Sequence, residues 1–305
     1  MSPVAAVDVG TNSVRLLVMA DDGTRILRKI VTTRLGYGVD RTGRLDDDAL
    51  ARTLDVLAGF AHDWQAHGVT DRVRIVATSA VRDATDRDRF FVGVEKATGH
   101  LPQVISGDEE AALAFSGAVA SVGVLGPCVV VDIGGGSTEL VLGAEGEPVR
   151  HAVSLQLGCV RITERNFTTD PVSPAEYQQA RDDVQQRLLG ATEVIEAAKR
   201  DKVTTLIGVA GTATTLGALY KNLASYDEDA IHNTHIPADA LHRLTSELLN
   251  ETVAKRRTRG PVQPGREDVL HAGALILREI VDALGSDGVI VSERDSLDGV
   301  ASGLL

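Results

Sequence analysis

The chain is poor in several features that mark particular classes of protein. It has only two cysteines in 305 residues, Cys128 and Cys159, which are too few for a disulfide framework and favour a reducing cytoplasm. No apolar run approaches the roughly 20 residues that span a bilayer, and the start, MSPVAAVDVG, lacks the basic region of a secretory signal. The net charge of −12 argues against general nucleic-acid binding. We therefore expect a cytoplasmic protein with no membrane or nucleic-acid partner.

The common nucleotide-binding and zinc-binding motifs are absent as well. Neither the Walker phosphate loop nor the GxGxxG fingerprint occurs, which excludes P-loop and Rossmann dinucleotide sites. His232 and His235 lie three residues apart, but no neighbouring Cys or further His completes a zinc site. The hydrophobic content of 43% is that of an ordinary globular protein, and the length suits two domains.

The most informative stretch runs from Cys128 to Gly143 and reads CVVVDIGGGSTELVLG. A buried strand is expected to reach Asp132, and three consecutive glycines precede a second apolar strand. Glycine lets a bound group approach the backbone closely. Successive bare N–H groups form a concavity for anions, and a carboxylate can hold a hard cation such as Mg²⁺. An ordinary glycine-rich hairpin turn is the alternative for this stretch taken alone.

The same pattern occurs near the N-terminus. The stretch from Val4 to Met19 reads VAAVDVGTNSVRLLVM, and it aligns with the glycine-rich stretch without a gap. Matching positions include Asp8 and Asp132, Gly10 and Gly134, Ser13 and Ser137, and Leu16 and Leu140. The two turns lie 124 residues apart, so the chain is predicted to contain two related halves. Two phosphate-binding hairpins facing each other across a cleft would explain the repeat.

Apolar periodicity predicts an α/β protein in which strands alternate with helices. Beyond the hairpins, strands are expected at 25–35, 72–77, 103–105, 149–157, 204–209 and 289–291. Helices are expected at 46–64, from 78 to about 98, and at 109–122, 173–189, 237–251, 266–284 and 296–305, and two more are expected to begin within 157–161 and 211–215. Ser173 and Glu176 form a capping box at the start of one of them. The predicted first domain covers residues 1–122 and is rejoined by the C-terminal segment 293–305; the second covers 123–292.

Polar residues outside the hairpins suggest the chemistry. Glu109 and Glu110 open a helix, where acidic residues commonly offset the helix dipole; alternatively, one of them is a general base that activates water. Arg82, in a strand-to-helix turn, and Arg15, inside the first hairpin, have guanidinium groups that suit phosphate. The stretch 208–215, GVAGTATT, is a third turn that suits an anion at a helix N-terminus.

A basic run lies in the second half of the chain. Its members are Lys255, Arg256, Arg257, Arg259 and, after a Pro/Gly linker, Arg266. They form either a solvated face or the lining for an extended anion, and the sequence leaves both open. A polyanionic substrate needs such a local lining, or metal ions, because the net charge of −12 would repel it.

Together these motifs resemble the exopolyphosphatase/guanosine pentaphosphate phosphohydrolase family, a member of the actin-like, sugar-kinase and Hsp70-type phosphotransferase superfamily. The resemblance extends from residue 4 to the last strand. It rests on the two hairpins, Asp8–Ser13 and Asp132–Glu139, and on Thr78–Arg82, Ser106–Ala111, Leu157–Gly158 and Gly208–Thr212. It implies two ribonuclease-H-like, actin-like domains that face each other across a cleft.

The resemblance also implies roles for individual residues. Glu110 matches the family's catalytic base, and Arg82 matches its substrate-contacting arginine. Asp132 and Glu139 match acidic residues near the metal and the attacking water. The implied phosphate-binding residues are Asp8, Gly10, Thr11, Asn12, Ser13 and Arg15, then Gly134, Gly135, Gly136, Ser137 and Thr138, and finally Gly208, Gly211 and Thr212.

One segment departs from the family pattern. Family members carry Arg-Glu-Gly after the last strand, whereas this chain has Asp295-Ser296-Leu297-Asp298-Gly299, without the basic residue. The chain is also expected to be a short, two-domain form that ends at Leu305, without the additional C-terminal domains of long family members.

The expected function is hydrolysis of the terminal phosphate of inorganic polyphosphate, which releases orthophosphate with Mg²⁺ or another divalent cation and a water activated by Glu110. Removal of the 5′-terminal phosphate of guanosine pentaphosphate would use the same residues, and the sequence does not separate the two. A nucleotide-dependent kinase or actin-like ATP-binding module would need an adenosine pocket, for which 208–215 is the one candidate. The preferred chain length, the metal and a homodimeric state stay open.

Overall fold

The computed structural model describes residues 2–305 and contains two compact units. The first comprises the chain up to Leu113 together with Ser296–Leu305, and the second comprises Ala114–Asp295. The division therefore falls within helix α5 (Gly107–Val122), whereas the sequence-based boundary lies after residue 122. Among the residues described, no helix is both long and apolar enough to cross a membrane.

The first unit contains a five-stranded sheet in the order β3-β2-β1-β4-β5. Strands β1, β2 and β3 are antiparallel neighbours, whereas β4 runs parallel to β1 and β5 parallel to β4. Its elements are β1 (Val4–Val9), β2 (Ser13–Met19), β3 (Arg25–Thr32), α1 (Val39–Thr42), α2 (Asp47–Ala66), β4 (Val73–Ala77), α3 (Ser79–Asp83), α4 (Asp88–Thr98), β5 (Gln103–Val104), the start of α5, and α14 (Ser296–Ser302).

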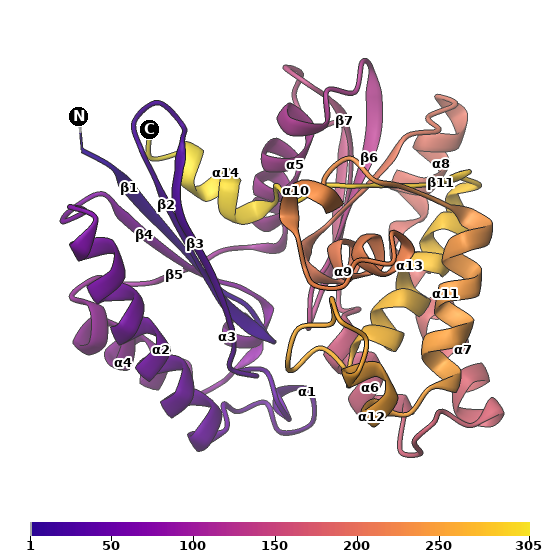
Figure 1. Cartoon of the computed structure of the whole chain (residues 1–305), viewed down its shortest axis with the longest axis horizontal. Coiled ribbons are helices and arrows are strands. Elements are labelled where there is room, and N and C mark those ends of the chain that lie inside the picture. Colours follow the sequence, from indigo (N-terminus) through magenta and orange to yellow (C-terminus); the bar gives the residue numbers. More distant parts are fainter. Residues whose placement is uncertain (1) are drawn as a thin grey trace. The chain divides into compact units, whose positions relative to one another are not determined.

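Both faces of this sheet are covered by helices. Because successive residues of a strand point to opposite faces, Ala5, Val7 and Val9 of β1 pack with apolar residues of α2 and α4. Val4 and Ala6 pack instead with apolar residues of α14. Figure 1 shows α2 and α4 on one side of the strands and α14, in yellow, beside β1 and β2. This two-sided burial explains why β1 is apolar at nearly every position.

The second unit contains a six-stranded sheet in the order β10-β11-β9-β6-β7-β8. Its strands are β6 (Pro127–Ile133), β7 (Thr138–Ala144), β8 (His151–Leu155), β9 (Leu206–Val209), β10 (His235–Pro237) and β11 (Gly288–Val291). Its helices are α6 (Cys159–Asn166), α7 (Pro174–Leu188), η1 (Leu189–Ala191), α8 (Thr192–Arg200), α9 (Ala210–Tyr220), α10 (Glu228–Ile231), α11 (Ala238–Asn250), α12 (Val253–Arg257) and α13 (Leu270–Leu284).

The second sheet repeats the arrangement of the first. Strands β8-β7-β6-β9-β11 take the positions of β3-β2-β1-β4-β5, and antiparallel β10 is added at the edge. In both sheets the first three strands form an antiparallel meander and the next two continue in parallel. The predicted α/β class with two ribonuclease-H-like sheets is confirmed.

Several elements differ from the prediction. The helix expected from 78 to about 98 is interrupted, because Ala84 has extended backbone angles (φ −74°, ψ 132°) between α3 and α4. The helix expected at 266–284 begins only at Leu270. Strand β10, helices α1, α8, α10 and α12, and the short helix η1 are additional. The capping box of Ser173 and Glu176 is confirmed at the start of α7.

Candidate active site

The β1–β2 hairpin places a carboxylate beside a tight turn. Asp8 lies opposite Arg15 in the antiparallel pair. The turn closes with a 3.0 Å hydrogen bond from the N–H of Gly10 to the carbonyl of Ser13. A Cβ atom at Gly10 would lie 3.2 Å from that carbonyl oxygen, so a side chain at this position would press on the turn.

The β6–β7 hairpin has the same construction. Asp132 lies opposite Glu139, and the N–H of Gly134 donates to the carbonyl of Ser137 at 3.0 Å. A Cβ atom at Gly134 would lie 3.3 Å from that oxygen. The sequence repeat therefore corresponds to one turn geometry used in both units.

The segment after β3 supports the first turn from behind. The N–H of Gly36 donates to the carbonyl of Thr11 at 2.8 Å, and the N–H groups of Thr33 and Arg34 both donate to the carbonyl of Asn12. Gly36 lies so close that a Cβ atom there would sit 2.1 Å from Cγ2 of Thr11. These hydrogen bonds hold the carbonyls of Thr11 and Asn12 in a direction that points toward this segment.

The segment after β8 supports the second turn in the same way. Cys159 and Val160, at the start of α6, donate their N–H groups to the carbonyls of Gly134 and Gly135 at 3.0 and 2.9 Å. A Cβ atom at Gly158 would lie 2.3 Å from the carbonyl oxygen of Gly135. Only glycine lets the backbone of residue 158 approach the loop this closely.

This support fixes the direction of the loop amides. In a planar trans peptide, a carbonyl and the N–H that follows it point in opposite directions. Because the carbonyls of Gly134 and Gly135 are turned toward α6, the N–H groups of Gly135 and Gly136 point away from it. Within residues 2–305, no hydrogen bond is made by the N–H groups of Gly135, Gly136 or Ser137. Consecutive N–H groups of this kind form an anion-binding nest.

The glycine that packs behind each hairpin turn was recognised from the sequence in only one half. Leu157-Gly158 was recognised as a motif, whereas its counterpart Leu35-Gly36 was missed. The signal was available, because each pair follows closely after the third strand of a repeat, Leu35 after β3 and Leu157 after β8. Extending the alignment of the hairpins through the third strand, with a gap of two residues, would have revealed it.

The two acidic residues at the start of α5 have different surroundings. Glu109 pairs with Arg74 at 2.6 Å, and 45% of its side chain is exposed. Glu110 is buried, and its Oε2 accepts a 3.1 Å hydrogen bond from Nη1 of Arg82. The same nitrogen donates to the carbonyl of Ile105 at 3.0 Å, which fixes the guanidinium. The structure thus brings together Glu110 and Arg82.

The surroundings of Glu110 change its acidity. Burial raises the pKa of the Glu110 carboxyl to about 7, and the negative charge of Asp8 acts in the same direction, while Arg82 and Arg15 oppose both. A carboxyl with this pKa is substantially ionised at neutral pH and is also basic enough to accept a proton from water. Such a pKa suits a general base.

The two hairpins differ in the residue opposite the aspartate. Oδ2 of Asp8 accepts a 2.9 Å hydrogen bond from Nε of Arg15, so the first hairpin contains an ion pair. In the second, Asp132 faces Glu139; both are buried, and Glu139 Oε1 accepts a 2.7 Å bond from Ser154 Oγ. Like charges directly opposite destabilise a strand pair. The second hairpin therefore places two carboxylates opposite each other, and carboxylate oxygens are ligands that Mg²⁺ takes.

The carboxylates of the second hairpin suit a cation whose remaining ligands are substrate oxygens and water. No group of three or more His, Cys, Asp or Glu side chains that could hold a metal occurs among residues 2–305. Mg²⁺ usually takes one or two carboxylates and completes its shell with water and phosphate oxygens. The Asp132–Glu139 pair fits this coordination and does not form a closed protein cage.

The C-terminal segment that departs from the family pattern packs on the first hairpin. Oγ of Ser296 accepts a 3.0 Å hydrogen bond from Nη2 of Arg15. Asp298 pairs with Arg28 of β3 at 2.9 Å. Helix α14 therefore contacts Arg15 and Arg28 of the first sheet, and Arg15 also pairs with Asp8.

The third turn lies at the start of α9 and packs closely against a basic side chain. A Cβ atom at Gly211 would lie 1.8 Å from Nη1 of Arg266. At Gly273 of α13, a Cβ atom would lie 2.6 Å from Oγ1 of Thr212. Arg266, expected in the basic run, is thus placed directly against the third turn.

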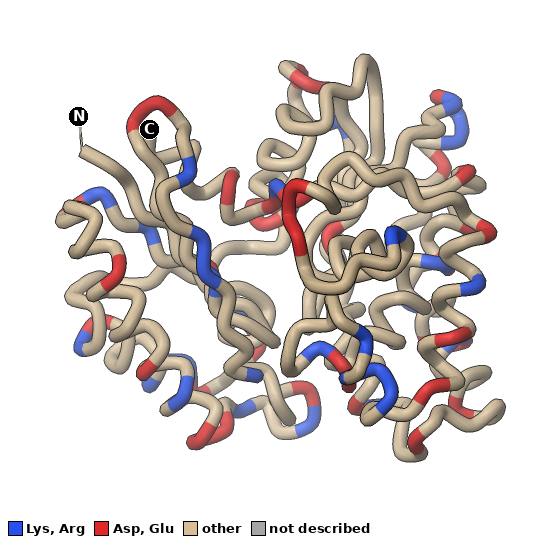
Figure 2. Tube along the Cα trace, in the orientation of Figure 1, with Lys and Arg blue, Asp and Glu red and all other residues tan. Residues whose placement is uncertain are grey.

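The other arginines of the basic run have partners within the second unit. Arg256 is buried, and its Nη1 donates to the carbonyl of Leu248 at 2.8 Å. Arg257 pairs with Glu267, and Arg259 with Glu251, each at 2.9 Å. Basic and acidic positions lie next to each other around α12 (Figure 2). That the basic run lines a polyanion site stays a prediction. The contacts show that these arginines also link α12 to neighbouring segments of the second unit.

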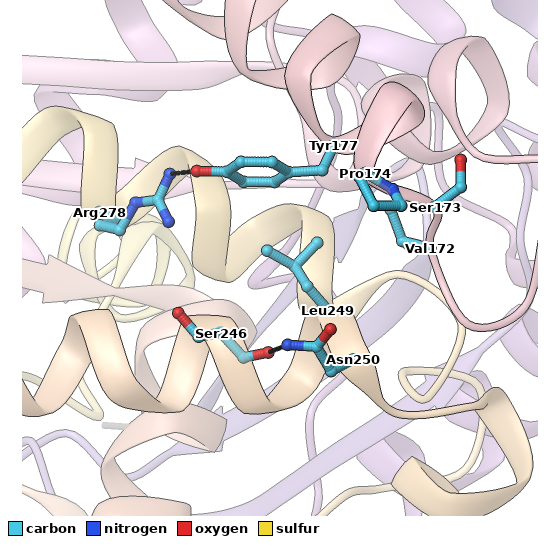
Figure 3. Close-up of a pocket in the computed structure, with 8 residues that line it drawn as sticks. All are labelled: Val172, Ser173, Pro174, Tyr177, Ser246, Leu249, Asn250 and Arg278. Atoms are coloured by element: carbon cyan, nitrogen blue, oxygen red, sulfur yellow. Dashed lines mark hydrogen bonds between the residues drawn. The ribbon is translucent and has the colours of Figure 1, made fainter.

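A separate pocket of the second unit contains none of the predicted site residues. Its volume is about 310 Å³, and it lies between α7, α11 and α13. Nη2 of Arg278 donates to the hydroxyl of Tyr177 at 2.9 Å across one wall (Figure 3). Asn250 of α11 is tied to the carbonyl of Ser246 on the opposite wall.

Comparisons with known proteins show the family of the chain. The Ppx/GppA phosphatase family matches over residues 17–305. The chain is 42% identical to Exopolyphosphatase 2 of Mycobacterium tuberculosis, with 100% of this chain and 99% of that protein covered. It is 38% identical to a guanosine-5′-triphosphate,3′-diphosphate pyrophosphatase of Vibrio cholerae, covering 58% of this chain and 36% of that protein. A crystal structure of an exopolyphosphatase-like protein has a TM-score of 0.90 at 36% identity, with 99% and 100% covered. The chain belongs to the Ppx/GppA phosphatase family.

Proposed function

We propose that this chain is an exopolyphosphatase, a phosphoanhydride hydrolase that removes the terminal phosphate of inorganic polyphosphate as orthophosphate. The observation that carries the proposal is Glu110, a buried carboxyl whose pKa is raised to about 7 by burial and which contacts Arg82. The full-length similarity to Exopolyphosphatase 2 supports this substrate class.

The chain's own residues account for the steps of hydrolysis. The ionised Glu110 accepts a proton from water, and the water oxygen forms a bond to the terminal phosphorus. The phosphoanhydride bond breaks, and its electron pair leaves with the shortened polyphosphate. Backbone N–H groups of the glycine loop stabilise the negative charge on the phosphoryl oxygens, and Arg82 orients the terminal phosphate.

Asp132 and Glu139 are the proposed ligands of a divalent cation. Mg²⁺ bound there would offset the charge of the substrate oxygens. The opposed carboxylates in the β6–β7 pair support this assignment. A cytoplasmic location is supported by Cys128 and Cys159, which are buried and form no disulfide bond, as is usual in a reducing compartment.

The assay that tests the proposal measures orthophosphate release from polyphosphates, from tripolyphosphate to long chains, with and without Mg²⁺. Guanosine pentaphosphate is assayed in parallel, because part of the chain also resembles the Vibrio cholerae pyrophosphatase. We expect Mg²⁺-dependent release from polyphosphate with the larger kcat/KM. A larger kcat/KM for guanosine pentaphosphate would replace the proposed substrate, and transfer of phosphate to a small acceptor would indicate a kinase.

Replacing Glu139 by Gln should raise the Mg²⁺ concentration needed for half-maximal activity by roughly 10–100-fold. The physical reason is the loss of one of two opposed carboxylates. Glu193→Gln is the matched control, because 83% of that side chain is exposed on α8. Titration of activity with Mg²⁺ measures the effect. An unchanged Mg²⁺ requirement in Glu139→Gln would remove this residue from the proposed metal site.

Replacing Arg82 by Met should move the acid limb of the pH–rate profile to higher pH. The positive charge of Arg82 lowers the pKa of Glu110, so its loss leaves the base protonated over a wider range. In the wild type, kcat/KM should fall tenfold per pH unit below a pKa of about 7. Profiles are compared after scaling to their plateaus. A shift to lower pH in Arg82→Met would contradict Glu110 as the titrating base.

A further inference from the structure

The glycine loop of the second unit is also held by a buried arginine. Arg161 lies in the first turn of α6 and is only 7% exposed. Its Nε donates a 2.6 Å hydrogen bond to the carbonyl of Gly136. Gly136 is the last of the three glycines, and the residue that follows it is Ser137.

A side chain is needed here because the backbone donors of α6 are already engaged. The N–H groups of Cys159 and Val160 donate to the two preceding glycine carbonyls. The N–H of Arg161 also donates to the carbonyl of Gly135, at 3.3 Å, and the N–H of Ile162 is bonded to Gly158 within the helix. No further backbone N–H at the start of α6 is left for the third carbonyl, so the guanidinium of Arg161 reaches it. By peptide planarity, this bond turns the N–H of Ser137 away from α6.

In the first unit, the corresponding carbonyl is held by backbone N–H groups instead of a side chain. The carbonyl of Asn12, which corresponds to that of Gly136, accepts hydrogen bonds from the backbone N–H groups of Thr33 and Arg34. Counted from the supporting glycines, the counterpart of Arg161 is Val39, a buried apolar residue. The two halves therefore differ at this position. The buried arginine supports the loop of the second unit, the unit in which Asp132 faces Glu139.

We infer that Arg161 is a positioning residue for phosphoryl binding. Its Nε–H fixes the carbonyl of Gly136 and thereby aims the N–H of Ser137 at the bound phosphoryl group. The guanidinium also places a fixed positive charge behind the anion-binding nest. This inference rests on the proposed function, and it goes beyond it by assigning the alignment of one loop amide to a residue that does not touch the substrate.

The test compares Arg161→Met and Arg161→Lys with the wild type. Lysine keeps the charge, but its ammonium does not reproduce the planar, directed donor of a guanidinium. We expect kcat/KM for polyphosphate to fall about 10–100-fold in both variants and orthophosphate binding, measured by phosphorus NMR line broadening, to weaken at least tenfold. Arg187→Met is the control, because Arg187 of α7 is bonded to Asp183 and Gln156 in the same unit.

The thermal midpoint separates positioning from a purely structural role. If Arg161 only stabilises the unit, Arg161→Lys lowers the midpoint and leaves orthophosphate affinity unchanged in the folded protein, and the inference is overturned. Weakened affinity with a near wild-type midpoint in Arg161→Lys supports it, even if Arg161→Met does not fold. If the wild type binds orthophosphate through Arg161 yet does not hydrolyse polyphosphate, the proposed function fails and the positioning role stands.

Discussion

Replacing Glu110 by Gln is expected to lower kcat for phosphate release from polyphosphate by about 10²–10⁴-fold, the usual contribution of a general base. Glutamine has nearly the same shape and can still contact Arg82, but it cannot accept the proton of the attacking water. Binding of polyphosphate should be affected much less than kcat, because the glycine loops and Arg82 are retained. Initial rates at saturating substrate and Mg²⁺ measure the effect.

The neighbouring glutamate is the matched control. Glu109 begins the same helix but pairs with Arg74, and nearly half of its side chain is exposed. Glu109→Gln should retain activity within about threefold, as surface substitutions usually change little. Full activity in Glu110→Gln, with its fold intact, would remove Glu110 from the mechanism.

The same substitution should change how stability depends on pH. The pKa of Glu110 is about 7 in the folded protein, against an ordinary value of 4.5. The carboxyl therefore contributes stability below the ordinary value, and this contribution is lost as pH rises through about 7. Relative to the wild type, Glu110→Gln should gain stability between pH 5 and pH 8, by roughly 1–3 kcal/mol. Thermal unfolding at the two pH values measures the difference.

Replacing Gly158 by Ala is the second change with a large expected effect. The backbone angles of Gly158 (φ −144°, ψ 159°) are open to any residue. Glycine is needed here because neighbouring atoms leave no room for a side chain. A Cβ atom would lie 2.3 Å from the carbonyl oxygen of Gly135 and 2.5 Å from the nitrogen of Gly136. Both neighbours are backbone atoms, and the loop must shift. We expect kcat/KM to fall about 10²-fold and stability to fall by about 1–3 kcal/mol.

Gly59→Ala provides the control for that change. A Cβ atom at Gly59, inside α2, has no atom within 4 Å, so this variant should be fully active and up to about 1 kcal/mol more stable. Activity and chemical denaturation are measured for both variants. Wild-type kcat/KM in Gly158→Ala would show that the loop tolerates displacement, and would contradict its role in aligning the phosphoryl group.

Much of the fold follows from local sequence patterns. The repeat of Asp8 on Asp132 predicted two hairpins with one geometry, and the capping box at Ser173 predicted the start of α7. Elements decided by distant contacts were not predictable. Strand β10 has only three residues and exists because it pairs with β11. Helix α12 lies in a basic run whose Arg256 is buried against the carbonyl of Leu248.

The site was predictable in its residue types but not in its interactions. The residues themselves left Glu109 and Glu110 equivalent, and the family resemblance selected Glu110; burial and the contact with Arg82 now give a physical reason for that choice. The sequence assigned Arg15 to phosphate and Glu139 to the metal, but it did not predict that each lies directly opposite the aspartate of its hairpin. The role of Arg161 was missed, because a hydrogen bond between residues 25 positions apart leaves no local pattern.

Hydrolysis in water labelled with oxygen-18 tests the central claim most directly. If Glu110 activates water for attack on the terminal phosphorus, each released orthophosphate carries one labelled oxygen, and the shortened polyphosphate carries none. Phosphorus NMR or mass spectrometry of the products after a single turnover distinguishes the two positions. The account predicts label in orthophosphate alone. Label at the end of the remaining chain, or release of fragments longer than one phosphate, would contradict it.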